Sequence, residues 1–305
     1  MDTVASIYSD HLFERNFNQG AYFPFSSYRP LTYRPLTYRP LAEEETSVWR
    51  IILLGLVQGL SEFLPVSSSG HLIVLRGFFG IVSRGAQWEV ALHGGTLLAI
   101  FAGYRHDLAT VMRGAVQGQS EMRKTVALIA VATIPADAVG YGLNTWITQW
   151  FIPLAAGAGW LATTAALWLT PEAGYGTKRI DELSWEGALF IGAAQSVALW
   201  PGLSRSGSTI FVGRVLGLSP AEAARFSFYM AIPVIAGAIL LTFVSGTPIG
   251  GRCLPGVAIG VGVAAISGLF AIEWVKHALA TTRLWRRFGW YTLILGIVTL
   301  WLGGF

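Results

Sequence analysis

The chain has 305 residues and a net charge of +4; 53% of its residues are hydrophobic and only 12% are charged. In an ordinary soluble domain about a quarter of the residues are charged, whereas 36 glycines and 12 tryptophans are typical of a helical membrane protein. The composition therefore predicts an all-α polytopic membrane protein. It excludes nucleic-acid binding, which requires a dense basic surface, and the single cysteine, Cys253, excludes an internal disulfide.

Residues 1–47 are predicted to be an extension outside the membrane domain. The pentapeptide YRPLT occurs twice in tandem and is followed by YRPLA, so proline recurs at Pro30, Pro35 and Pro40. Proline at this spacing is incompatible with a helix and favours extended, solvated chain. No apolar stretch with a small-residue cleavage site is present, so we predict no signal peptide. We expect a disordered extension over 1–47 and a membrane domain over 48–305.

Two kinds of apolar segment follow. The first kind is long enough, at about 20 residues, to span a bilayer. Such spans are predicted at 86–104, 124–143, 150–169, 222–244, 253–275 and 287–305. The second kind has an apolar half, a polar centre of Gly, Ser and Pro, and another apolar half. These broken segments are predicted at 48–80 and 184–217, each as a re-entrant helix, break and helix.

The two broken segments match each other. Gln58 pairs with Gln195 and Gly70 with Gly207, each 137 residues further along. We therefore predict a duplication, in which each copy is one broken segment followed by three transmembrane helices. Repeat one covers 48–170 and repeat two covers 184–305.

Charged connections predict how the two copies lie in the membrane. Arg and Lys gather in 105–124 and 276–287, and the positive-inside rule places both in the cytoplasm. The connection 144–149 has no charge and 245–252 has only Arg252, so both are expected outside. Because each copy has three spans, an odd number, repeat two is predicted to be inverted relative to repeat one. Inverted repeats with broken helices are typical of transporters.

The polar centres contain groups suited to a phosphate. Gln58 and Glu62 are four residues apart and share one helical face. Serines cap helices, and the free N–H groups of a helix start bind anions; we expect Ser69 and Ser208 to be the caps. Arg205 offers phosphate oxygens a planar fork of donors. We expect the two centres to meet near the middle of the membrane.

These motifs resemble the undecaprenyl-diphosphate phosphatase family, also known as the bacitracin-resistance proteins. The first family motif, Glu/Gln-x-x-x-Glu followed by F-L-P-V-S-S, is matched by 58–68, and the second, P-G-x-S-R-S-x-x-T, by 201–209. The stretches 91–100 and 226–238 also look similar to the family. The resemblance covers 48–305. It implies a multi-pass enzyme of the bacterial cytoplasmic membrane that removes the terminal phosphate of undecaprenyl diphosphate, giving the carrier lipid for cell-wall synthesis.

The resemblance also implies roles for individual residues. Family activity needs a divalent cation, Mg²⁺ or Ca²⁺, which is assigned to Glu62 and Gln58. The implied catalytic residues are Glu62, Ser68, His71 and Arg205. The implied substrate-binding residues are Gln58, Ser67, Gly70, Ser204, Ser206 and Thr209. His71 is expected to activate either Ser68, the preferred nucleophile, or a water.

Some alternatives stay open. The family often has Glu at the position of Gln58, so this side chain either binds the metal or only donates and accepts hydrogen bonds. Glu89 and His93, four residues apart, are expected to lie around the site. A polyprenyl-phosphate transporter or flippase is the alternative function, a scaffold is a further one, and a homodimer is compatible with the sequence. A P-S-G-H acid phosphatase is excluded, because its S-R-x5-H motif requires histidine where the chain has Phe211.

Overall fold

The computed structural model describes residues 47–79, 87–172, 174–244 and 254–303. Over these ranges the chain is helical and contains no β-strand, so the predicted all-α class is confirmed. The extension predicted at 1–47 and the connection at 245–252 lie almost entirely outside the described residues, as does Cys253.

The helices follow one another along the chain as predicted for a broken segment and its spans. In the first half they are α1 (Val48–Phe63), α2 (Ser68–Phe79), α3 (Gln87–Gly103), α4 (Arg105–Val116), α5 (Ser120–Gly142), α6 (Asn144–Thr148) and α7 (Pro153–Leu169). In the second half they are the 3₁₀ turn η1 (Ile180–Glu182), α8 (Trp185–Val197), α9 (Arg205–Val215), α10 (Pro220–Val244), α11 (Leu254–Leu279) and α12 (Thr282–Gly303).

Several of these helices have the length and the surface of membrane spans. Within the described residues, Ser120–Gly142, Pro220–Thr242 and Pro255–Leu279 are long and apolar enough to cross a bilayer, and α3 and α7 are shorter apolar helices. Large apolar side chains cover their outer faces, as Ile134 on α5 and Phe270 on α11 illustrate. An exposed apolar surface of this extent is stable against lipid rather than water. The chain is therefore a multi-pass helical membrane protein.

The predicted connections are more helical than expected. The charged segment 105–124 is mostly α4, which packs its buried Val111 and Gly114 against α5. The connection 276–287 is reduced to two residues between α11 and α12, and 144–149 contains α6. Charge density led us to predict the connections at 105–124 and 276–287, but an amphipathic helix or a charged helix end tolerates the same residues when they face water.

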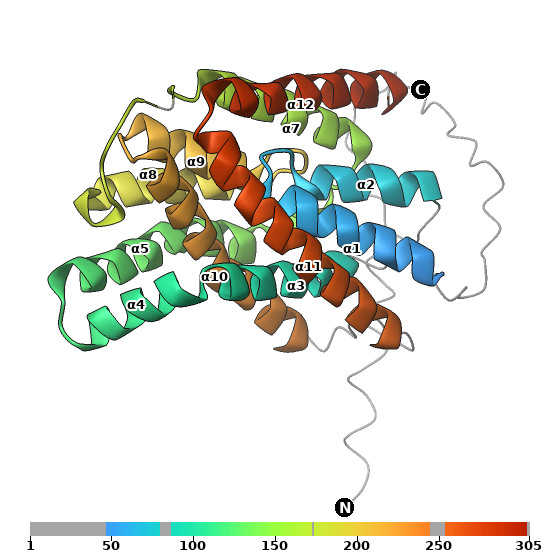
Figure 1. Cartoon of the computed structure of the whole chain (residues 1–305). Helices are drawn as coiled ribbons and strands as arrows, with labels where there is room; N and C mark the ends of the chain where they lie inside the picture. The colour runs from blue at the N-terminus through green and yellow to red at the C-terminus, as the bar shows by residue number, and fades with distance from the viewer. Residues whose placement is uncertain (1–46, 80–86, 173, 245–253, 304–305) are drawn as a thin grey trace, which may run out of the picture. The chain divides into compact units, whose positions relative to one another are not determined.

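Both broken segments are confirmed, and their polar centres meet. The first break, 64–67, separates α1 from α2, and the second, 198–204, separates α8 from α9. In Figure 1, α1 and α2 extend from their break to one side and α8 and α9 extend to the opposite side. Ser206 Oγ donates to the Leu64 carbonyl at 3.3 Å, and Gly202 N donates to Ser69 Oγ at 3.4 Å.

Glycines set the closest helix contacts. Helix α1 packs on α11 and α8 packs on α5. A Cβ atom at Gly55 would overlap the carbonyl oxygen of Gly260, and one at Gly192 would overlap that of Ala132. Gly55 and Gly192 are 137 residues apart, like the motif pairs, so the two broken segments use the same small residue for the same kind of contact.

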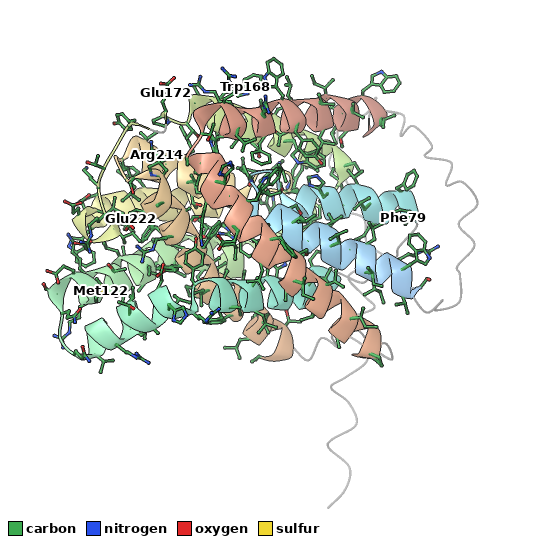
Figure 2. All side chains as sticks on the ribbon, viewed as in Figure 1. Phe79, Met122, Trp168, Glu172, Arg214 and Glu222 are labelled. Carbon is green, nitrogen blue, oxygen red and sulfur yellow. The ribbon has the colours of Figure 1, made fainter. Side chains whose placement is uncertain are left out.

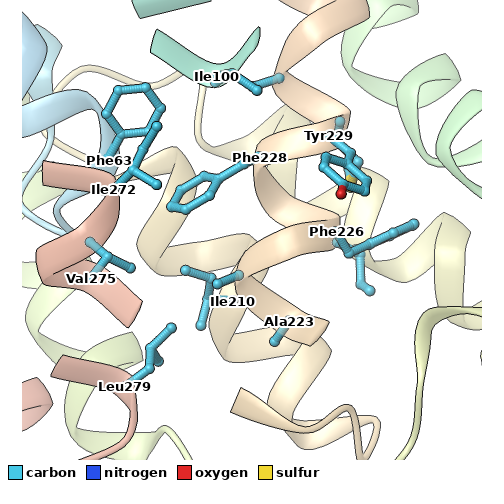
Figure 3. Close-up of a cluster of buried hydrophobic side chains, with 14 of the residues drawn as sticks. Phe63, Ile100, Ile210, Ala223, Phe226, Phe228, Tyr229, Ile272, Val275 and Leu279 are labelled. Carbon is cyan, nitrogen blue, oxygen red and sulfur yellow. The ribbon is translucent and has the colours of Figure 1, made fainter. Parts of the chain in front are cut away.

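The largest apolar core lies beside the first break (Figure 3). Phe63, the last residue of α1, meets Phe228 of α10 edge to face, with 5.3 Å between ring centroids. Ile100 of α3 and Ile272 of α11 belong to the same cluster. Because Phe63 directly follows Glu62, this packing fixes where the end of α1 presents its carboxylate.

Candidate active site

Helix α7 braces both breaks. The indole N–H of Trp160 donates to the Val66 carbonyl at 2.7 Å in the first break. One turn further, Thr163 Oγ1 donates to the Gly202 carbonyl at 3.0 Å and accepts from Ser204 N at 2.9 Å in the second break. These bonds satisfy backbone groups that have no helical partner inside the membrane, where an unsatisfied group is costly.

Each break ends in a serine cap, but not in the serines we expected. Ser204 Oγ accepts from Gly207 N at 3.1 Å, and Ser67 Oγ accepts from Gly70 N at 3.4 Å. The prediction of Ser69 as a cap was wrong, because this residue already lies inside α2; Ser208 likewise lies inside α9. An N-cap precedes the first helical residue and bonds the N–H three positions later.

Ser67 has an unusual backbone. Its φ of 66° is the left-handed region, which a residue with a side chain seldom adopts. Strain of this kind persists only where surrounding contacts enforce it, and it concentrates at functional sites. Here it turns the chain sharply enough for α2 to start directly after the break. As a result, the side chain of Ser68 lies against the end of α1.

Glu62 is the centre of the site. Ser68 Oγ donates to its Oε2 at 2.7 Å and Gln58 Nε2 donates to the same oxygen at 3.1 Å. Arg205 Nη2 donates to Oε1 at 2.8 Å, and His93 Nε2 lies 3.4 Å from Oε2. Glu62 is buried, with 8% of the residue exposed. These contacts bring together α1, α2, α3 and α9, and therefore both broken segments.

A second cluster surrounds Arg205. Its Nη1 donates to the Ser227 carbonyl at 3.0 Å, and Ser227 Oγ lies 2.7 Å from Thr209 Oγ1. Ser204 Oγ and Ser206 Oγ are 3.2 Å apart. All four hydroxyl residues of α9 and its cap are buried. The guanidinium is thus held at the α9 N-terminus, beside hydroxyls that accept and donate hydrogen bonds.

His71 occupies a separate place from the Ser68 and Glu62 pair. Its Nδ1 lies 2.6 Å from the Ser67 carbonyl and its Nε2 lies 2.7 Å from the hydroxyl of Tyr291. The hydroxyl of Ser68 donates to Glu62 instead. The predicted activation of Ser68 by His71 is therefore not the contact made in this structure, and the acidic side chain beside Ser68 is that of Glu62.

The surrounding residues are partly as expected. His93 reaches Glu62 as predicted, and its Nδ1 bonds the Glu89 carbonyl at 2.5 Å. The Glu89 carboxylate pairs with Arg76. Ser227 and Tyr291 were missed, because they are single polar residues on spans and only the packing of α10 and α12 brings them to the site.

The oxygen atoms at the site suit a hard cation. Gln58 Oε1 is buried and has no hydrogen-bond partner among the described residues, and it belongs to the side chain that bonds Glu62. Amide and carboxylate oxygens are the ligands that Mg²⁺ and Ca²⁺ prefer. No group of three or more His, Cys, Asp or Glu side chains suited to a metal occurs among the described residues. A cation held here would therefore take its other ligands from substrate and water.

The glutamine of the second broken segment also has unpaired polar atoms among the described residues. Gln195, the counterpart of Gln58, is buried on α8, and neither its amide nitrogen nor its amide oxygen has a hydrogen-bond partner among the described residues. Buried amides are nearly always hydrogen-bonded. The sequence repeat pairs this residue with Gln58, but Gln195 was not among the predicted site residues.

The comparisons with known proteins all indicate the same family. Residues 51–298 match the family described as "Bacitracin resistance protein BacA". A protein named undecaprenyl-diphosphatase from Desulfosudis oleivorans is 38% identical over 83% of this chain and 97% of its own length. Proteins of the same name from Thermomicrobium roseum and Korarchaeum cryptofilum are 37% and 36% identical, over 83% and 82% of this chain and 97% of their own lengths. The chain belongs to the bacitracin resistance protein BacA family.

Proposed function

We propose that this chain is an undecaprenyl-diphosphatase, which hydrolyses the terminal phosphate of undecaprenyl diphosphate and yields undecaprenyl phosphate. The observation that carries the proposal is the buried carboxylate of Glu62, held between the Ser68 hydroxyl of one broken segment and Arg205 of the other. Family membership and the names of the relatives support the same reaction. They give no support to a flippase.

The geometry supports Ser68 as the nucleophile, with Glu62 as its base. As Ser68 Oγ attacks the terminal phosphorus, its proton passes to Oε2 of Glu62, 2.7 Å away. A bond forms between Oγ and phosphorus, and the anhydride bond breaks with undecaprenyl phosphate as the leaving group. Water then attacks the phosphoserine, which releases phosphate and restores the hydroxyl. His71 keeps its predicted role toward a water as the other route.

Arg205 and the α9 N-terminus are suited to stabilise the transferred phosphoryl group. Phosphoryl transfer depends mainly on neutralising charge and aligning the attacking oxygen. The guanidinium already binds an anionic oxygen at 2.8 Å, that of Glu62. Ser204, Ser206 and Thr209 lie within two turns of it and offer hydroxyl donors to the other phosphate oxygens. Ser67 and Gly70 form the corresponding turn at the start of α2.

A divalent cation, Mg²⁺ or Ca²⁺, is part of the proposal. Glu62 and Gln58 Oε1 are the residues that would hold it. When bound, the cation would supply positive charge to the diphosphate oxygens, in addition to that of Arg205. The carboxylate of Glu62 and the amide oxygen of Gln58 would hold the cation, and Glu62 also bonds the Ser68 hydroxyl.

We also propose that the two copies are inverted repeats in the bacterial cytoplasmic membrane. The matched glycines at 55 and 192 and the opposite directions of the two broken segments support the inversion. The domain division at 47 and 48 and a homodimer stay predictions. Light scattering of the protein in detergent measures the oligomeric state.

The experiment that tests the function is phosphate release from undecaprenyl diphosphate by the purified full chain. We expect Glu62→Gln to lower kcat by at least about a hundredfold, because it removes the base while keeping the shape of the side chain. Chelation of divalent cations should stop the wild-type reaction, and adding Mg²⁺ or Ca²⁺ should restore it. Binding or translocation of the lipid without any phosphate release would refute the enzyme and favour the transporter.

A further inference from the structure

A basic pocket that shares no lining residue with the Glu62 site lies between the N-terminal end of α12 and the chain just after α7. It has a volume of about 540 Å³ and is lined by Arg283, Arg286, Arg287, Trp290 and Glu172. Figure 2 labels Glu172 and Trp168 at this end of the two helices. None of these residues belongs to the proposed reaction.

The three arginines of the pocket lie close together because of their spacing along the α-helix. Arg283 precedes Arg286 by three residues and Arg287 by four. Trp290 follows Arg286 by four residues, so the four side chains share one face of α12. We predicted this charge to lie in a connection, with the span starting at residue 287. The helix instead starts at Thr282, which places all three guanidinium groups on its first two turns.

This arrangement is electrostatically unfavourable for the protein alone. A helix N-terminus has a partial positive charge, so basic side chains there destabilise the helix, and like charges one turn apart repel. The compensation among the described residues is small. Arg286 lies 3.9 Å from a carboxylate oxygen of Glu172, whose side chain is 75% exposed. The pocket therefore has a net positive charge that an anionic ligand would stabilise.

The aromatic residues place the pocket at the level of lipid head groups. Trp290 is exposed, and its ring centroid lies 4.8 Å from that of Trp168. The indole N–H of Trp168 donates to the Arg286 carbonyl at 3.3 Å, so the aromatic pair is fixed directly beside the arginines. Tryptophan concentrates at the membrane–water interface, and arginine next to it is typical of the cytoplasmic side. Leu169, the last residue of α7, follows Trp168 directly and exposes its apolar side chain.

We propose that this pocket binds the head group of an anionic phospholipid from the leaflet that is predicted to be cytoplasmic. The guanidinium groups would bind the lipid phosphate, as basic pockets between transmembrane helices do. Trp290 and the neighbouring apolar surface would contact the glycerol and the start of the acyl chains. A lipid fits better than free phosphate, because only a lipid uses both the charged and the apolar parts of the pocket. The inference is independent of the proposed function.

The test measures lipid binding to the delipidated full chain in a neutral detergent by native mass spectrometry. The probes are phosphatidylglycerol, phosphatidylcholine with the same acyl chains, and inorganic phosphate. We expect phosphatidylglycerol to bind best, and Arg283→Gln/Arg286→Gln/Arg287→Gln to weaken its binding by roughly tenfold or more. A matched variant, Arg105→Gln/Arg113→Gln/Arg123→Gln, removes three exposed charges from the other predicted cytoplasmic connection and should leave this binding within about twofold.

A second variant keeps the test decisive if the triple variant does not fold. Glu172→Gln removes the competing carboxylate, so we expect tighter binding of phosphatidylglycerol, with no change for phosphatidylcholine. The proposal is overturned if the two triple variants lose binding equally, if inorganic phosphate or phosphatidylcholine binds as well as phosphatidylglycerol, or if Glu172→Gln has no effect. None of these outcomes depends on phosphatase activity.

Discussion

Glu62 and its hydrogen bonds explain why a charged residue is tolerated at the broken end of a membrane helix. An unpaired buried carboxylate is expensive, but this one accepts from a guanidinium, a hydroxyl and an amide. The donors come from two segments of the chain that are more than a hundred residues apart. Each half of the candidate site therefore supplies hydrogen-bond partners that help to stabilise the other half.

Ser68 and its neighbour Ser69 give a matched pair for testing the nucleophile. Ser68→Ala removes the hydroxyl that bonds Glu62, and we expect kcat to fall by at least about a thousandfold. Ser69 Oγ bonds Ser67 Oγ and Gly202 N instead, so Ser69→Ala should cost no more than about tenfold. The measurement is steady-state phosphate release, with thermal unfolding as a control for folding. Equal, small losses in both variants would assign the attack to water.

At Arg205, the contribution of the positive charge to activity can be tested separately from that of the forked guanidinium group. Arg205→Lys keeps a positive charge but loses the fork that joins Glu62 Oε1 to the Ser227 carbonyl. We expect a loss of about a hundredfold in kcat/KM, and a larger loss with Arg205→Ala, which leaves Glu62 without its cation. Phosphate release at fixed Mg²⁺ measures both. Full activity of the lysine variant would show that a point charge is sufficient.

At the scale of elements, helix contacts depend on glycines at matched positions of the two broken segments. Such residues let backbones approach closely, and in a membrane this packing replaces much of the hydrophobic effect between helices. The contact of α1 with α11 holds the Glu62 end of α1 in place, and the contact of α8 with α5 holds the second break. Helix α7 then fixes both breaks through Trp160 and Thr163.

Gly55 and Gly262 provide the test of this packing. Gly55→Ala places a methyl group on the Gly260 carbonyl, and we expect it to destabilise the protein by about 1–3 kcal/mol. Gly262 is also on a helix of this contact, but it has open space around it, so Gly262→Ala should be neutral or stabilising. Thermal unfolding in detergent compares the two. Equal stability of both variants would contradict close packing of α1 on α11.

At the scale of the whole molecule, the two copies are proposed to have opposite orientations. Gln149 and Thr281 lie in equivalent connections, each following the second span of its copy, and both are exposed. The positive-inside rule predicts that they lie on opposite sides of the membrane, with Gln117 on the side of Thr281.

Cysteine labelling distinguishes the orientations. In a Cys253→Ser background, Gln149→Cys should react with an impermeant maleimide in right-side-out vesicles, whereas Gln117→Cys and Thr281→Cys should react in inverted vesicles. Labelling of Gln149→Cys and Thr281→Cys from the same side would refute the inversion. The measurement needs no activity, so it is independent of the proposed reaction.

The amino-acid sequence alone determined the class of protein, both broken segments and most residues of the site. Composition reports membrane burial directly, and proline with clustered serine ends a helix through local sterics and capping. The repeat in spacing then indicated that Glu62 and Arg205 belong to one site. The first two properties depend on residues near each other in the chain, and the repeat compares one such local pattern with another, so all are visible without a structure.

Only the tertiary structure decided which side chains meet. Ser68 bonds Glu62 rather than His71, the caps are Ser67 and Ser204, and Tyr291 reaches His71 from α12. The charged segments that we predicted as connections became α4 and the first turns of α12. Such contacts are set by how helices rotate and approach each other, and a one-dimensional pattern of hydropathy contains neither the rotation nor the distance.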